Sequence, residues 1–222
     1  MFTRVTRTYN EAFSGCTNLQ SISLPEGLTL IGQQAFYKLT NLVRCKLPST
    51  LRTINNNAYS GCTNLSDITL PPSIISIGQG GFNGTKIGGT LYLPNLTTVG
   101  QYGMFVGTNI EYITSLGSIT TTNNGGSGYG FCYGCKQLKS VILPTTLTTL
   151  GSYAFYDCTD LKIVVCEATV PPTFGSNALK NTPCIIYVPD ESITAYREAS
   201  NWSAYADRIL PLSEYAEYKN YL

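Results

Sequence analysis

The sequence predicts a repeat solenoid, in which short coils stack on one another around a continuous core. An aromatic ring recurs every 23 residues, and a small or unbranched residue precedes each ring. A fixed period of this length indicates that one unit cannot bury its own apolar face, so neighbouring units must stack. We expect mostly β and irregular structure with one parallel β-ladder and a helical cap at the C-terminal end. The five leading rings are Phe13, Phe36, Tyr59, Phe82 and Phe105.

Every unit has the same order of residue types. The first four read EAFSGCTNLQSISLPEGLTLIG, QAFYKLTNLVRCKLPSTLRTI, NAYSGCTNLSDITLPPSIISIG and GGFNGTKIGGTLYLPNLTTVG. They share the pattern A-F-x-x-C-x-x-L-x-x-I-x-L-P-x-x-L-x-x-I. After Phe105 a shorter unit ends near Ile119, and a Gly-rich insertion follows at Thr120–Gly128. Units on Phe131 and Phe155 then resume the pattern.

The segment L-x-x-I-x-L before the Pro alternates with period two, which predicts a short strand with the Pro at its end. The second apolar pair of each unit, such as Leu28 and Ile31, is expected to line the opposite wall of the coil, with the aromatic ring filling the corner. The inward residues of the predicted ladder are Ile22 and Leu24, Cys45 and Leu47, Ile68 and Leu70, Leu91 and Leu93, Val141 and Leu143, and Val164 and Cys166.

A degenerate unit on Ala178 and Leu179 closes the solenoid, so we expect residues 1–189 to form the solenoid, with its insertion near 120–128. Residues 190–222 are expected to form a C-terminal helical cap and tail. Within them, ESITAYREAS predicts a short helix with Asp190 as its N-cap.

The helix is expected to cover the open end of the sheet, because terminal repeats are usually capped and exposed strand edges invite pairing. Trp202, Tyr205 and Ile209 are expected to complete this lid. Residues Leu212–Leu222 are interpreted either as a further short helix or as a tail ordered by a partner.

Composition excludes several classes of function. Charged residues make up only 12% of the chain, the net charge is +1, and Lys and Arg do not cluster, so nucleic acid is not expected as a partner. The sequence contains no run of 18 apolar residues, so membrane insertion is not expected. The first ten residues lack the apolar stretch of a secretory signal. We therefore expect a mature domain or part of a longer protein.

The chain contains no His, which removes the common Ser-His and Cys-His nucleophilic systems and the His-based zinc sites. Its 13 acidic residues are scattered without a catalytic spacing. We expect no enzyme activity, no catalytic residue, no metal site and no cofactor.

The eight cysteines are interpreted as core residues. Cys16, Cys62 and Cys158 fall at the same place in their units, and Cys135 falls there after a one-residue insertion. A disulfide between stacked neighbours such as Cys135 and Cys158 stays an alternative, and the lone Cys132-x-x-Cys135 is weak support for zinc.

The outward positions of the ladder are where a ligand is expected, since these side chains are not needed in the core. Arg44, Lys46 and Asp67 form a charged patch, and Tyr92 and Tyr112 an aromatic one; Arg and aromatic residues are common interface anchors. These five residues are the candidate ligand-binding face. Towards the C-terminus the outward positions become apolar, which indicates either cover by the cap or tail or a further contact surface: Ile142, Ile163, Val165 and Ile185.

The repeat resembles the BspA-type leucine-rich repeat from about Asn10 to Pro189, on motifs such as AFSGCTNLQSISLP and AYSGCTNLSDITLP. The C-terminal run from Pro171 to Ile209 resembles the closing segment of such arrays in gut Bacteroidetes proteins. The resemblance implies a leucine-rich-repeat-like stack in a surface-exposed or secreted bacterial protein, with some members acting as adhesins. It carries over no catalytic or ligand residue.

The leading hypothesis is a non-enzymatic adhesion module, located outside the cell or on a bacterial cell surface, that binds a protein or glycan through the strand face. Rigid solenoids suit this role because preorganised side chains lose little entropy on binding. The alternative is a structural, assembly or spacer role with self-association, which the uncapped first coil and the Tyr-rich tail favour.

Overall fold

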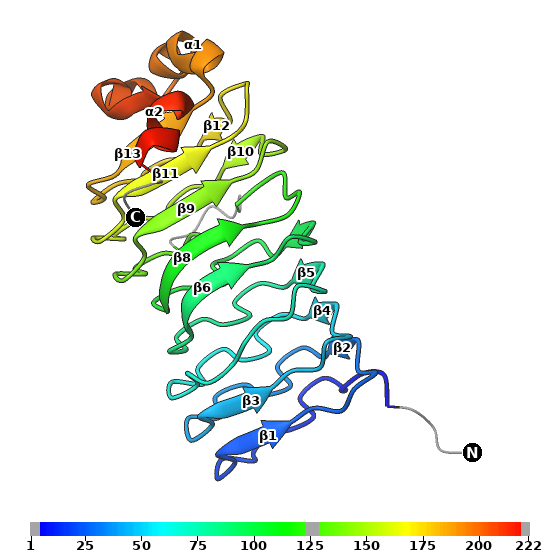
Figure 1. The fold of residues 1–222 in the computed structure, drawn as a ribbon. Coiled ribbons are helices and arrows are strands. Elements are labelled where there is room, and N and C mark those ends of the chain that lie inside the picture. Colours follow the sequence, from blue (N-terminus) through cyan, green and yellow to red (C-terminus); the bar gives the residue numbers. More distant parts are fainter. Residues whose placement is uncertain (1–4, 123–128, 219–222) are drawn as a thin grey trace.

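The computed structural model describes residues 5–122 and 129–218 and is an elongated stack of about eight coils (Figure 1). The first coil lies at one end of the stack, and the short helices lie at the other (Figure 1). The predicted repeat solenoid with parallel strands is confirmed.

The strands on one side of the solenoid form the first ladder, which is divided into two sheets: β1 and β3 near the N-terminal end, and a six-stranded sheet from β6 to β14 (Figure 1). Its strands pair in parallel, and a bridge between Arg44 and Asp67 carries the pairing past β3. Their inward residues are buried or half-buried, as the alternation predicts. The strands are β1 (Ser21–Ser23), β3 (Arg44–Lys46), β6 (Gly88–Tyr92), β8 (Asn109–Ser115), β9 (Ser140–Leu143), β11 (Ile163–Cys166), β13 (Ile185–Val188) and β14 (Ile209–Pro211).

The opposite wall, expected only to be lined by apolar residues, carries a second parallel ladder of two-residue strands, divided into a four-stranded and a two-stranded sheet. Thr121 bridges to Thr149, so this ladder continues into the first residues of the predicted insertion. The rest of that insertion, 123–128, lies outside the described residues. The strands are β2 (Leu30–Ile31), β4 (Thr53–Ile54), β5 (Ser76–Ile77), β7 (Thr98–Val99), β10 (Thr149–Leu150) and β12 (Thr173–Phe174).

A column of aromatic rings fills the corner between the two ladders. From Phe13 to Phe105 the rings stack nearly parallel, with interplanar angles of 10°, 3°, 8° and 4°. The ring centroids are 4.6, 4.9, 5.2 and 5.7 Å apart. Because the period brings each ring over the one before, the column joins neighbouring coils.

The column changes at Phe131, where our alignment of the repeat was wrong by one residue. In the earlier coils the backbone N–H of the ring residue donates to the carbonyl of the residue before the next ring, as from Phe36 to Ala58. Here the N–H of Phe105 donates to Phe131, and that of Cys132 donates to Ala154. Cys132 therefore takes the ring position, and Phe131 takes the small-residue position.

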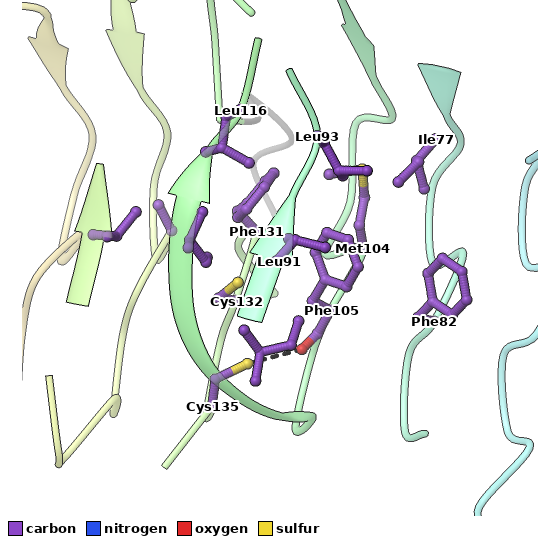
Figure 2. Close-up of a cluster of buried hydrophobic side chains, with 14 of the residues drawn as sticks. Ile77, Phe82, Leu91, Leu93, Met104, Phe105, Leu116, Phe131, Cys132 and Cys135 are labelled. Atoms are coloured by element: carbon purple, nitrogen blue, oxygen red, sulfur yellow. Dashed lines mark hydrogen bonds between the residues drawn. The ribbon is translucent and has the colours of Figure 1, made fainter. Parts of the chain in front are cut away.

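The ring of Phe131 still fills the core, but it enters from the neighbouring backbone position. Its plane lies at 65° to the ring of Phe105, whereas Phe82 and Phe105 are parallel within 4° (Figure 2). With Cys132 in the ring position, Cys135 follows at the regular interval, so the expected one-residue insertion does not exist.

The cysteine position has its own polar chemistry. The thiols of Cys62, Cys135 and Cys158 each donate to the carbonyl of the ring residue one coil earlier, at 2.8, 2.8 and 3.1 Å (Figure 2 shows the bond from Cys135 to Phe105). A small side chain with a weak donor suits this position. All eight cysteines are free thiols, and seven are buried. Cys16 is exposed, contrary to expectation, because the first coil has no neighbour on its outer side among the described residues.

The C-terminal segment forms the predicted cap. A 3₁₀ turn (Asp190–Ser192), α1 (Ile193–Glu198) and a second 3₁₀ turn (Ser203–Arg208) lead into β14, which extends the first ladder. Trp202 is fully buried; its ring contacts Phe174 and Tyr196 edge-on, and its Nε1 donates to the carbonyl of Pro172 at 2.7 Å.

The expected N-cap was wrong, because Asp190 does not cap α1. The N-cap of α1 is Ser192, whose hydroxyl instead donates to the carbonyl of Thr169 at 2.7 Å. Asp190 Oδ1 accepts from the backbone N–H of Ser213 at 3.0 Å, at the start of α2 (Leu212–Tyr218), and this bonding lowers the pKa of Asp190. The Asp190 carboxylate thus accepts a hydrogen bond from the first turn of α2. From the sequence, this segment was interpreted either as a short helix or as a tail.

Candidate binding surface

We call the outward side of the first ladder the strand face. Along it the strands alternate between inward core residues and outward residues, as in β3, where Cys45 is buried between exposed Arg44 and Lys46. Parallel pairing places corresponding outward residues of successive coils side by side. The fold therefore displays the predicted columns as an ordered array.

Near the N-terminal end, the structure brings Arg44, Lys46 and Asp67 together. The Arg44 guanidinium forms an ion pair with the Asp67 carboxylate across the bridge between their coils. Both side chains stay more than half exposed, at 67% and 55%, so this ion pair contributes little to stability. With Lys46 they line a hollow of about 580 Å³.

The two predicted tyrosines lie on adjacent strands. Thr90 pairs with Tyr112, and two register shifts place Tyr92 opposite Ser115, so the tyrosines are diagonal neighbours. Tyr92 is 55% exposed and Tyr112 39% exposed. Tyr92 lies between two hollows of about 410 and 300 Å³, because it lines both of them.

Tyr112 has charged neighbours that the sequence analysis missed. Lys139 Nζ lies 5.3 Å from the centre of the Tyr112 ring and 2.6 Å from Glu111 Oε2. The hydrogen bond that the Lys139 ammonium donates to the Glu111 carboxylate raises the pKa of Lys139, which keeps its ammonium charged. Asp160 and Lys162 join them around a hollow of about 380 Å³. The pairing of Tyr112 with Ser140 across the insertion could have revealed Lys139, since it stands one residue earlier.

The apolar part of the strand face is covered at its C-terminal end. Tyr187 is only 4% exposed, and its ring centroid lies 5.2 Å from that of Tyr215 on α2. Its neighbour Val165 is also buried. Ile163 remains half-buried and lines the hollow beside Tyr112. Cover by the cap thus explains one end of this stripe, and Ile142, Ile163 and Ile185 stay partly open.

Two of the buried thiols, those of Cys45 and Cys62, do not supply a nucleophile. Burial raises the pKa of Cys45 to about 11 and that of Cys62 to about 12, so both stay protonated at neutral pH. Within residues 5–122 and 129–218, no group of three Cys, Asp or Glu side chains could hold a metal ion. In the same part of the chain, no helix is long and apolar enough to cross a bilayer.

The comparisons with known proteins define the class. Six copies of the BspA type leucine rich repeat region match the chain, over residues 2–111 and 126–200. The chain belongs to this family. Proteins of this kind are typically found on bacterial surfaces, and leucine-rich repeat families are generally non-catalytic scaffolds for interaction. No curated protein matches the chain.

Solved structures agree on the fold. A leucine-rich repeat protein from Bacteroides ovatus is 22% identical with a TM-score of 0.58, and the match covers 82% of this chain. The chain spans 58% of the length of that protein. A leucine-rich repeat protein from T. pallidum is 25% identical with a TM-score of 0.52, over 88% of this chain and 77% of the other.

Proposed function

We propose that the chain is a non-enzymatic recognition module that binds a protein or glycan ligand through the strand face, outside the cell or on a bacterial cell surface. The observation that carries the proposal is the exposed array of Arg44, Lys46, Asp67, Tyr92 and Tyr112. The core does not need these side chains, yet parallel pairing holds Arg44 beside Asp67 and places the two tyrosines on adjacent strands, and a series of hollows lies along them.

The aromatic pair is the expected anchor. Tyrosine supplies a large contact area with few rotatable bonds, so its ordering costs little on binding. Tyr92 and Tyr112 lie on regular strands, and the hollows beside them are of a size that accepts a side chain or a sugar residue. The nearby charges of Lys139 and Glu111 can add specificity.

A binding screen of the purified protein against host matrix proteins and glycans tests the proposal, with Tyr92→Ala/Tyr112→Ala run beside it. We expect saturable binding that the double variant loses at unchanged melting temperature. Tyr9→Ala is the matched control, because Tyr9 is 73% exposed and lies outside the first ladder. Equal binding by wild type and the double variant would contradict the assignment of this face.

A structural or assembly role is the second candidate. Among the residues that the structure describes, Phe13 is half-buried and β1 pairs on one side, with β3. Strand edges of this kind can pair with another chain. Sedimentation at increasing protein concentration tests this role: a well-folded protein that self-associates and binds nothing in the screen would support it over recognition.

A further inference from the structure

Four tyrosines gather on the turns that lead from the second ladder to the first, away from the strand face. They are Tyr129, Tyr133, Tyr153 and Tyr156, which we call the tyrosine cluster. Tyr133 and Tyr156 stack with centroids 5.1 Å apart and 13° between their planes. Tyr129 meets Tyr133 edge-on at 5.2 Å, and Tyr153 lies 5.4 Å from Tyr156 and 6.5 Å from Tyr133.

The repeat does not require aromatic residues at these turns. Tyr133 and Tyr156 directly follow the ring position of their coils, and Tyr153 stands two residues before it. Equivalent positions elsewhere are mostly small or polar. Directly after the ring position they are Ser14, Tyr37, Ser60, Asn83, Val106 and Lys180, and two residues before it they include Glu11, Gln34, Asn57 and Gly80.

Tyr153 also adopts a backbone conformation that favours other residues. Its φ is 56°, in the left-handed region, which the equivalent positions of other coils also adopt: Glu11, Gln34, Asn57, Gly80 and Asn177. Asn and Gly enter this region readily, whereas a bulky side chain does so at a cost. The left-handed turn is therefore a property of the repeat, and among these residues only Tyr153 adds an aromatic ring to it.

The cluster combines open ring surface with a polar rim. Tyr129 is 57% exposed, and the other three rings are half-buried. Asp157 follows Tyr156, and its Oδ1 accepts from Asn181 Nδ2 at 3.3 Å. Lys180 is the next residue of the column that contains Tyr133 and Tyr156. Partial burial, with the neighbouring Tyr156 and Asp157, raises the pKa of Tyr133, so its hydroxyl stays protonated.

We propose that the tyrosine cluster is a second binding site, for a neutral saccharide. A pyranose ring has a C–H face that packs on aromatic rings, and hydroxyl groups at its edge that pair with carboxylate, amide and phenol groups. The rings supply the first kind of contact, and Asp157 and Asn181 supply the second. The positive charge of Lys180 would repel a cationic ligand, and the negative charge of Asp157 would repel an anionic one.

Affinity electrophoresis tests this site, with native gels that contain soluble xylan, mixed-linkage β-glucan, galactomannan, starch or dextran. We expect at least one of these neutral polysaccharides to retard the protein. Tyr133→Ala/Tyr156→Ala should weaken binding by about tenfold or more, because central aromatic anchors carry much of the binding free energy. Tyr133→Phe/Tyr156→Phe should stay within about threefold of wild type, since it keeps the rings that stack.

Two controls separate this site from other surfaces. Tyr37→Ala removes a tyrosine from the same turn position in a coil without the cluster, and it should bind as wild type does. Tyr92→Ala/Tyr112→Ala should also bind these polysaccharides normally. The two proposals can therefore fail separately, because each is tested by variants of its own site. If the double alanine variant is unstable, Tyr129→Ala replaces it, because the exposed ring can be removed without opening the core.

No retardation of the wild-type protein by any of the five polysaccharides would overturn the proposal. Equal losses in Tyr37→Ala and in the cluster variants would overturn it as well, because the effect would then not belong to this site. Loss confined to the cluster variants supports it.

Discussion

The two ends of the solenoid fill the same core in different ways. From Phe13 to Phe105 the rings repeat at one period and stack within 10° of parallel. From Phe131 onward the ring planes lie at 65° and then 56° to the preceding ring, and Cys132 holds the ring position. The strand pairing nevertheless continues across this change, from β8 to β9 and on to β11. The ladders therefore define the fold, and the rings adapt to it.

The ends differ in closure as well. Phe13 is half-buried and stacks on one neighbour, Phe36, whereas Trp202 is fully buried against Phe174 and Tyr196 at the other end. In a solenoid each coil is stabilised chiefly by its neighbours, so truncations of Phe13 and of Trp202 should have different effects on stability.

The largest expected effect concerns this difference in closure. Trp202→Ala should lower the free energy of unfolding by about 3–5 kcal/mol, through the cavity and the lost bond to Pro172. Phe13→Ala should cost clearly less, because its ring is already partly in water. Urea denaturation followed by circular dichroism measures both. Equal losses would show that the two ends are energetically alike.

A double-mutant cycle at the change of register should show the next largest effect. Phe131→Ala leaves a cavity and Cys132→Phe overfills the ring position, so each single change should be destabilising. Phe131→Ala/Cys132→Phe restores the order found in the earlier coils. The double variant should therefore lose about 1–3 kcal/mol less unfolding free energy than the sum of the two single losses.

The same urea measurements give this coupling. Phe36→Ala/Cys132→Phe is the matched control, because the two sites lie in separate coils and their losses should add. Additive losses at Phe131 and Cys132 would contradict the register described here.

The smallest expected effect is a pH dependence of stability in the second coil. Burial raises the pKa of Cys45 from 9.0 to about 11. Above pH 9 the unfolded chain loses this proton while the native chain keeps it, so stability falls as pH rises towards 11. Cys45→Ala should reduce that fall by about 1 kcal/mol at pH 10.

Unfolding free energies at pH 8 and pH 10 measure the difference. A fall of the same size in the wild type and in Cys45→Ala would contradict the assignment of this pH dependence to the Cys45 thiol.

The sequence predicted most outward residues of the strand face, but it did not predict where the C-terminal helix covers this face. Period-two alternation is enough to assign Arg44, Lys46, Asp67, Tyr92 and Tyr112 to the outer side of a ladder. It cannot show that α2 covers Tyr187, because cover depends on a segment more than twenty residues further along the chain.

The shift at Phe131 left a trace in the sequence. The intervals from Cys135 to Leu138 and from Cys158 to Leu161 are equal, so Cys135 corresponds to Cys158. The residues that precede them by the same interval, Cys132 and Phe155, then correspond as well. We aligned on the ring instead, and both residues are apolar enough for the core, so composition did not correct the error. The backbone hydrogen bonds resolve it, because they fix which residues lie opposite each other.

The sequence by itself determined the class of fold, since a 23-residue period with fixed apolar positions can bury its residues only by stacking. It also determined which strand residues point outward, because side chains alternate along a strand. Only the tertiary structure brought Tyr129, Tyr133, Tyr153 and Tyr156 together and paired Asp190 with α2. The physical reason is that the register in which the coils stack decides which residues of neighbouring coils touch. That register is fixed only when the coils are packed together.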